Sequence, residues 1–235
     1  MYEITLFEFF LFLSLFTIER IIPARKFPIF QHWFKHWLLL LSFATLWLSG
    51  LIAVWVFIPG LTTPLQALSF WPQVLVAYFI YTFIAYWYHR LRHTVPCLWR
   101  YVHYMHHSPA HMDTRVTFWR HPVEMILDSI VILAVGKLIG VSAEVIFCVL
   151  VIESMLETFH HSNIKTPKKL RWIGYVIQLP EQHLIHHQYG LHRWNYGTLT
   201  LWDSLFLTVK VPTEWQGKLG VREWNNTKRL LFYKY

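Results

Sequence analysis

The stretch WPQVLVAYFIYTFIAYWYHRLRH, residues 71–93, joins a long apolar segment directly to a pair of histidines. Residues 71–88 carry no charge and are rich in aromatic side chains. A helix needs about 20 predominantly apolar residues to cross the hydrocarbon core of a bilayer. The stretch therefore predicts a membrane-spanning helix that brings His89 and His93 to one membrane surface.

The rest of the chain has the composition of a membrane protein. Of its 235 residues, 55% are hydrophobic and 14% are charged, whereas about a quarter of the residues of a soluble domain are charged. Further apolar segments cover residues 4–19 and 37–57. The apolar region 123–159 is interrupted near Gly136, Lys137 and Gly140, which predicts a hairpin that dips into the membrane or crosses it twice. We expect one all-α, multi-span domain over residues 1–235.

The distribution of basic residues orients this prediction. Arg20, Arg25, Lys26 and Lys35 lie between the first two apolar segments, and residues 59–73 contain no Lys or Arg. By the positive-inside tendency, the first of these connections faces the cytoplasm. All histidine-rich regions then lie in a cytoplasmic helical cap. The formal charge of +8 is spread along the flanks of apolar segments, which favours lipid headgroups over nucleic acid as the partner.

The ends of the chain and its cysteines carry weaker signals. The first apolar segment has no basic residues before it, so we expect a retained span rather than a cleaved leader. Cys97 and Cys148 form no CxxC pair. They predict packing residues rather than a disulfide framework or a thiolate metal site.

Three histidine strings predict a metal site: HRLRH at 89–93, HYMHH at 103–107 and HLIHH at 183–187. Side chains three and four residues apart share one helix face, so each string can present its imidazoles together. Eight imidazoles exceed the four ligands of a tetrahedral ion, which favours two metal ions. Iron suits imidazole ligands and oxygen chemistry beside lipid. The HExxH pattern of zinc proteases is absent.

Two other classes of histidine-rich membrane protein stay open from the residues alone. A membrane cytochrome would place paired histidines inside its spans to hold haem, and the two central spans contain none before His89. A metal transporter or a non-catalytic metal-binding protein would place ionisable residues along a pathway inside its spans. Segments 37–57 and 71–88 carry no charged residue.

The three strings, in the order HxxxH, HxxHH and HxxHH, resemble those of the fatty acid hydroxylase and sterol desaturase superfamily. Further segments share the resemblance: RHPVE at 120–124, HSN at 161–163, NYG at 195–197 and LWDSLF at 201–206. Together they extend over about residues 85–208. In two places the chain departs from the superfamily: Leu207 stands where glycine is usual, and His192 where aspartate is common.

The resemblance implies a membrane-bound enzyme with a di-iron centre. It would use O2 to hydroxylate or desaturate a C–H bond of an acyl chain, a sterol-like lipid or an ether lipid, with hydroxylation favoured. Its electrons would come from a separate ferredoxin-like or cytochrome b5-like donor. The implied ligands are the eight histidines of the three strings and His161 as a ninth: His89, His93, His103, His106, His107, His161, His183, His186 and His187.

Other polar residues receive weaker predictions. Glu157, His160, His121 and His192 are open as contributors to the metal site. His111 is expected to be a loop histidine. His32 and His36 have the same spacing as His89 and His93, but their aromatic and basic surroundings predict interfacial residues. Because ligand histidines need oriented neighbours, four residues are candidates for that supporting role or for ordinary caps and turns: Glu124, Asn163, Asn195 and Asp203.

Overall fold

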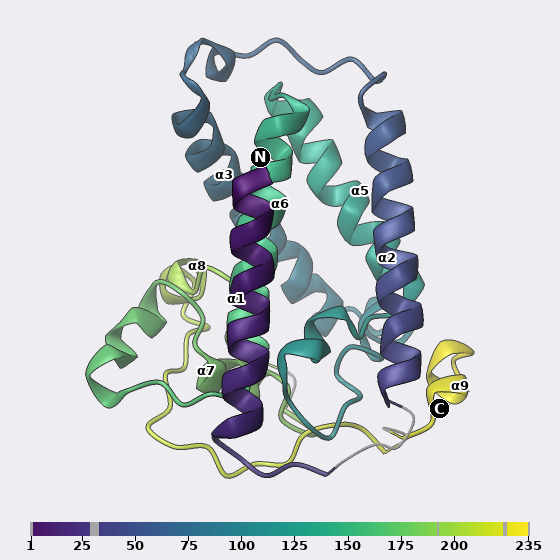
Figure 1. Cartoon of the computed structure of the whole chain (residues 1–235), viewed down its shortest axis with the longest axis vertical. Coiled ribbons are helices and arrows are strands. Elements are labelled where there is room, and N and C mark those ends of the chain that lie inside the picture. The colour runs from purple at the N-terminus through teal and green to yellow at the C-terminus, as the bar shows by residue number, and fades with distance from the viewer. Residues whose placement is uncertain (1, 29–32, 192, 223–224, 235) are drawn as a thin grey trace.

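A computed structural model describes the chain except residues 1, 29–32, 192, 223–224 and 235. Five long helices form a bundle, and the metal-ligand candidates lie at its lower end in Figure 1. Within the described residues no strand occurs, only one isolated bridge between Gln188 and Leu219. The long helices are α1 (Tyr2–Ile21), α2 (Trp33–Trp55), α3 (Phe70–Thr94), α5 (Pro122–Ile139) and α6 (Ala143–His161).

Short helices connect the long ones, and most of them lie toward the lower end of the bundle in Figure 1. Each contains three to eight residues, and three of them begin at a proline. They are η1 (Pro64–Ala67), α4 (Pro96–Leu98), η2 (Trp99–His103), η3 (Thr114–Phe118), η4 (Lys168–Tyr175), α7 (Pro180–His186), α8 (Leu201–Leu205) and α9 (Thr227–Leu231).

The predicted apolar segments are all helical. Two of the described helices, α2 over Phe34–Trp55 and α3 over Phe70–Thr94, are long and apolar enough to cross a membrane. Helix α1 also has sufficient length, but it carries Glu3, Glu8, Glu19 and Arg20. Membrane crossing by residues 4–19 therefore stays a prediction. Pro96 ends α3 immediately after the first histidine string, because the residue before a proline is disfavoured in helical conformation.

Region 123–159 forms the predicted helical hairpin, α5 and α6. Gly140 ends α5 in a left-handed conformation with φ of 72°, which glycine adopts without a steric cost. A side chain there would also meet the carbonyl oxygen of Leu61. The Gln66 side chain donates a hydrogen bond to the Gly140 carbonyl at 2.6 Å. The tip of the hairpin is thus held against the α2–α3 connection, at the upper end in Figure 1.

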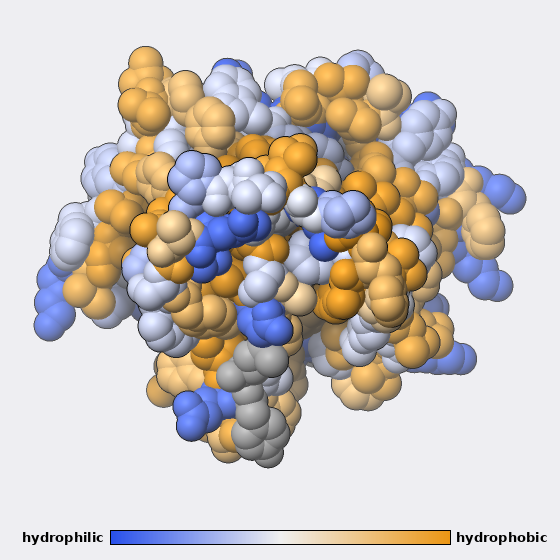
Figure 2. All heavy atoms as spheres, turned by 90° about the horizontal axis from the view of Figure 1, so that it is seen from above, coloured by the Kyte–Doolittle hydropathy of each residue, from blue (hydrophilic) through white to orange (hydrophobic). Residues whose placement is uncertain are grey.

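The packing of the bundle leaves much apolar surface exposed. Helices α1 and α3 pack on α6, and α2 packs on α5. Large apolar side chains such as Phe7, Leu39, Leu46 and Leu75 face outward, as expected for helices whose solvent is lipid. Viewed from above, apolar residues cover much of the surface, with hydrophilic residues between them and at the edges (Figure 2). Cys148 is packed as predicted, whereas Cys97 is exposed, so the packing prediction for Cys97 is wrong.

Candidate metal centre

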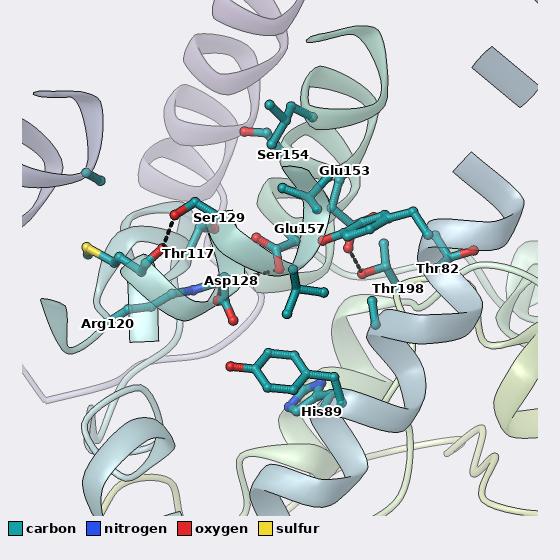
Figure 3. A pocket seen from close by; sticks show the side chains of 18 of the residues that line it. Thr82, His89, Thr117, Arg120, Asp128, Ser129, Glu153, Ser154, Glu157 and Thr198 are labelled. Atoms are coloured by element: carbon teal, nitrogen blue, oxygen red, sulfur yellow. Dashed lines mark hydrogen bonds and ion pairs between the residues drawn. The ribbon is translucent and has the colours of Figure 1, made fainter. Parts of the chain in front are cut away.

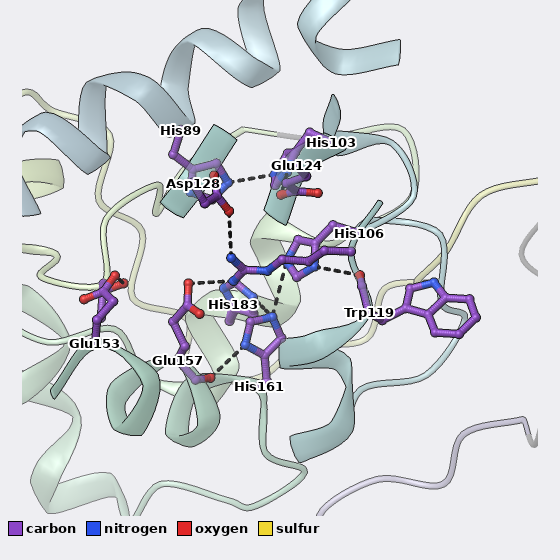
Figure 4. Close-up of polar contacts among 12 residues, drawn as sticks. His89, His103, His106, Trp119, Glu124, Asp128, Glu153, Glu157, His161 and His183 are labelled. Carbon is purple, nitrogen blue, oxygen red and sulfur yellow. Dashed lines mark hydrogen bonds and ion pairs between the residues drawn. The ribbon is translucent and has the colours of Figure 1, made fainter. Parts of the chain in front are cut away.

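Nine histidines converge in two adjoining groups at the lower end of the bundle, and they are the nine predicted ligands. Within each group, one ring nitrogen of every member lies within 4.8 Å of those of the others. The first group is His89, His93, His103, His107 and His186, and the second is His106, His161, His183 and His187. Figure 4 shows members of both groups side by side.

The histidine strings divide between the two groups. The last two turns of α3 give both histidines of HRLRH to the first group. HYMHH does not form a regular helical turn: His103 ends the π-helix η2, and residues 104–107 are a turn. This string places His106 in the second group, while α7 places His186 in the first. The rings of His107 and His187 stack with their centroids 4.0 Å apart, so the two groups are in direct contact.

Main-chain carbonyls set the orientation of four of these rings. Nδ1 of His89 lies 2.7 Å from the Tyr196 oxygen, and Nδ1 of His186 lies 2.9 Å from that of Trp194. A carbonyl can only accept, so each Nδ1 carries the proton and donates it. The other two Nδ1 contacts are His106 to Trp119 O at 3.3 Å and His161 to Glu157 O at 2.7 Å.

The Nε2 atoms of these four rings carry no proton, and they face one another in pairs. The Nε2 atoms of His89 and His186 are 3.1 Å apart, and those of His106 and His161 are 3.3 Å apart. Two lone pairs at such distances repel unless a cation lies between them. Nitrogens bound at about 2.1 Å to one metal ion and 90° apart are separated by about 3.0 Å. The donor set therefore fits a metal ion in each group.

Burial keeps the candidate ligands in the protonation state that a metal needs. The imidazoles of the second and third strings are almost fully buried. Burial lowers the pKa of His106 and His183 well below the ordinary value of 6.5, and the same holds for His103, His107 and His187. These rings are neutral at pH 7, and only a neutral imidazole can coordinate a metal ion.

A series of buried and partly buried ion pairs leads from the first group toward the second (Figure 4). It begins at the carboxylate of Glu124, which lies 2.7 Å from both His103 Nδ1 and Arg92 Nη1. Asp128 lies 3.1 Å from Arg92 and 2.9 Å from Arg120. Arg120 in turn donates to the Glu157 carboxylate at 2.7 Å. The main-chain carbonyl of Glu157 accepts from His161, so the ion pairs and one main-chain hydrogen bond together link the first group to the second.

Only part of this series of ion pairs could be predicted from the sequence. Glu124 was a predicted neighbour of the ligands and contacts His103 directly. Arg92 and Asp128 were not predicted. The signal for Arg92 was its position inside HRLRH, three residues from His89 and one from His93. Glu157 lies in neither histidine group, and its carboxylate pairs with Arg120.

Asp203 and Asn195 organise the loop that orients His89. The carboxylate of Asp203 accepts hydrogen bonds from the main-chain nitrogens of Tyr196 and Gly197, both at 2.8 Å. Asn195 donates to the Gln182 carbonyl at 3.0 Å and so ties this loop to α7. Leu207 has φ of 59°, so it adopts the left-handed conformation that favours glycine at this position. The Asn163 side chain, in contrast, forms hydrogen bonds with the main chain of Arg25 rather than with a loop that carries a candidate ligand.

The other histidines have different surroundings. His160 is buried with its ring centroid 4.1 Å from that of His183, but it belongs to neither group. His121 caps α5 by accepting from the main-chain nitrogen of Val123 at 3.1 Å. His36 lies 3.3 Å from the Thr227 hydroxyl, outside both groups. The predictions for His32 and His192 fall outside the described residues.

A cavity of about 230 Å³ lies above the first group, between α2, α3, α5 and α6 (Figure 3). His89 is the only candidate ligand among its lining residues. Its walls combine apolar residues, such as Ala44 and Leu150, with the carboxylates of Glu153 and Glu157. Glu153 accepts hydrogen bonds from the Tyr78 and Thr198 hydroxyls, at 2.9 and 2.8 Å. The cavity thus leads from between the long helices to one side of the candidate metal centre.

These features define a class: a helical protein with two candidate membrane spans and a buried, histidine-rich site for metal ions. The family model described as fatty acid hydroxylase matches residues 74–208, which include all nine candidate ligands. The chain belongs to the fatty acid hydroxylase family, and this membership implies an oxidoreductase. No curated protein and no solved structure matches the chain significantly.

His111 predicts a measurable pH dependence of stability. It lies in a loop, as expected, but it is buried, and burial lowers its pKa from 6.5 to about 4. Between pH 7 and pH 5 the unfolded chain binds a proton at this residue and the folded chain does not. The folded state should lose about 2 kcal/mol from this group over that interval.

The variant His111→Gln isolates this effect. Thermal unfolding in detergent, followed by circular dichroism at pH 7 and pH 5, should show a smaller loss of Tm for the variant than for the native protein. Equal losses would contradict the assignment, because the other titrating groups are common to both proteins.

Proposed function

We propose that the protein is a membrane-bound di-iron oxygenase that hydroxylates a C–H bond of a lipid. The observation that carries the proposal is the pair of adjoining histidine groups whose unprotonated nitrogens face one another beside a cavity between apolar helices. Family membership supports lipid as the substrate and oxidation as the reaction.

Two iron ions bound to the nine histidines would supply reductive activation of O2. The balance for hydroxylation is one O2, two electrons, two protons and one C–H bond, giving one C–OH and one water. Desaturation would consume the same O2, electrons and protons, remove two hydrogens from the lipid and give two waters. We propose a separate electron donor, ferredoxin-like or cytochrome b5-like.

The protein's own residues would position the substrate and the ligands. The cavity reaches the first group only at His89, so the reacting carbon would approach that group rather than the second. The carbonyls of Tyr196 and Trp194 hold the rings of His89 and His186 in one orientation, which points their Nε2 atoms toward the centre.

We also propose that the metal centre faces the cytoplasm. Arg20 in the last turn of α1 and Arg25 just after this helix lie at the same end of the bundle as the histidine groups, and they contact Asp113 and Glu181 at 3.2 and 3.9 Å. The α2–α3 connection at the opposite end has no Lys or Arg in residues 59–69. This asymmetry supports the cytoplasmic placement by the positive-inside tendency.

The proposal is tested by a comparative lipid profile of cells with and without the protein, together with the iron content of the purified chain. We expect about two irons per chain, as eight or nine imidazoles exceed the ligand needs of one ion. The profile should contain a lipid that gains one oxygen only when the protein is present. A lipid that loses two hydrogens would indicate desaturation instead. Bound iron with an unchanged lipid profile would favour a non-catalytic or transporting metal-binding protein.

The cavity itself can be tested separately from the metal centre. Ala44 on α2 lines the cavity, so Ala44→Trp is expected to fill it and to abolish turnover while the iron content stays unchanged. Ala53 lies on the same helix, is exposed and does not line the cavity. Ala53→Trp should therefore retain turnover, and equal activity of both variants would exclude the cavity as the substrate site.

A further inference from the structure

Helix η4 carries an unusual combination of basic and exposed apolar residues. Lys168, Lys169 and Arg171 belong to it, and no acidic residue occurs between Glu157 and Glu181. Its exposed apolar side chains are Leu170, Trp172, Tyr175 and, just after it, Val176. Trp172 exposes 65% of its surface. None of these residues is a member of either histidine group.

Helix α8 continues the apolar surface of η4. Leu205 is 64% exposed and Leu207 is 83% exposed. The Ser204 hydroxyl donates to the Tyr175 carbonyl at 2.9 Å, which joins α8 to the end of η4. We name residues 168–176 and 201–207 the wing, which projects sideways from the bundle beside the lower half of α1 (Figure 1).

The contacts of α8 place the wing relative to the membrane. The ring of Trp202 lies 4.5 Å from that of Phe79 and 5.0 Å from that of Phe83. Both phenylalanines belong to α3 within the candidate span Phe70–Thr94. The leucines of α8 therefore lie at the depth of a membrane-spanning segment. Helix η4, which carries the basic residues, lies lower than α8 in Figure 1, toward the histidine end of the bundle.

We infer that the wing is a membrane-interface anchor that binds anionic phospholipid. Tryptophan and tyrosine prefer the headgroup region, where an apolar ring and a polar tip are both accommodated. Basic side chains on an amphipathic segment are attracted to anionic headgroups. The wing has both features, and its apolar part adjoins a spanning helix. The inference uses the membrane placement of α3 but not the iron chemistry.

The wing is also connected to both parts of the candidate centre. The Gln182 side chain of α7 donates to the Gly174 carbonyl of η4 at 2.9 Å, next to His183. Asp203 of α8 holds the main-chain nitrogen of Tyr196, whose carbonyl orients His89. Anchoring the wing therefore stabilises the two segments that position these ligands.

The test measures the depth of the wing in a bilayer. A nitroxide label is attached at Trp172→Cys in a Cys97→Ser background, and the full chain is placed in nanodiscs of phosphatidylcholine with or without phosphatidylserine. Electron paramagnetic resonance then compares collisions with O2, which enters lipid, and with a water-soluble nickel chelate. The matched control is Tyr189→Cys. Tyr189 is a 58% exposed aromatic residue outside the wing, and its main-chain nitrogen donates a hydrogen bond to the Lys218 carbonyl.

The label at residue 172 should collide with O2 several-fold more, relative to the chelate, than the label at residue 189. Phosphatidylserine should increase this ratio, and Lys168→Glu with Lys169→Glu should cancel the increase. A second label at Leu205→Cys should be excluded from the chelate in both lipids. Equal chelate access at residues 172 and 189 would overturn the inference and favour a protein partner at the wing. A ratio unaffected by phosphatidylserine would overturn the preference for anionic lipid. Neither result would affect the proposed oxygenase function.

Discussion

Alanine in place of His106 or His186 is expected to remove iron and abolish turnover. His186 belongs to the first histidine group and His106 to the second, so the two variants test the two proposed ions separately. Each substitution removes a buried nitrogen donor, and no exposed histidine lies in the same group to replace it. Iron per chain is measured by elemental analysis, and turnover is measured from the lipid product.

The matched control for both variants is His36→Ala. His36 shares the HxxxH spacing with His32 as His93 does with His89, but it lies beside Thr227 and outside both groups. We expect it to retain iron and turnover. Full iron content in either His106→Ala or His186→Ala would refute the corresponding ligand assignment.

The second large effect is expected for Glu124→Ala. This carboxylate lies 2.7 Å from both His103 Nδ1 and Arg92 Nη1, and it is fully buried. Its removal leaves a buried guanidinium with Asp128 alone, and breaking such a buried pair costs on the order of 3–5 kcal/mol. Loss of the group that orients a ligand histidine typically lowers metal affinity by about 10–100-fold.

Chemical unfolding and iron competition with a chelator measure these two effects. Glu144→Ala is the control, because Glu144 is an exposed carboxylate in the first turn of α6. It should change neither stability nor iron affinity appreciably. Glu124→Gln keeps a hydrogen-bond acceptor for His103 but loses the charge that pairs with Arg92. Iron affinity in this variant should therefore lie between those of the native protein and Glu124→Ala.

Most of the helical plan could be predicted from residue patterns. The uncharged apolar run before His89 became α3, and the glycine-interrupted region became the hairpin of α5 and α6. These predictions succeed because a long apolar run has few stable conformations other than a helix in lipid. The spanning status of α1 is harder to predict, since its acidic residues and Arg20 oppose its apolar side chains.

The supporting contacts of the metal centre could not be predicted in the same way. Tyr196, Trp194, Trp119 and Glu157 orient the ligand rings through main-chain carbonyls. Every residue has such a carbonyl, so its side chain gives no signal of this role. Glu124 was predicted as a neighbour because its carboxylate is itself the contacting group.

The sequence by itself determined the membrane-like composition and the all-helical fold, and it predicted as ligands the nine histidines that the structure brings together. Spacing of three and four residues specifies which side chains share a short segment, and that information is local. Only the tertiary structure decided how the histidines divide, with HYMHH and HLIHH each contributing to both groups. It also decided that Arg92, Asp128 and Arg120 connect them. Those relations depend on how distant helices pack against one another, which no local spacing records.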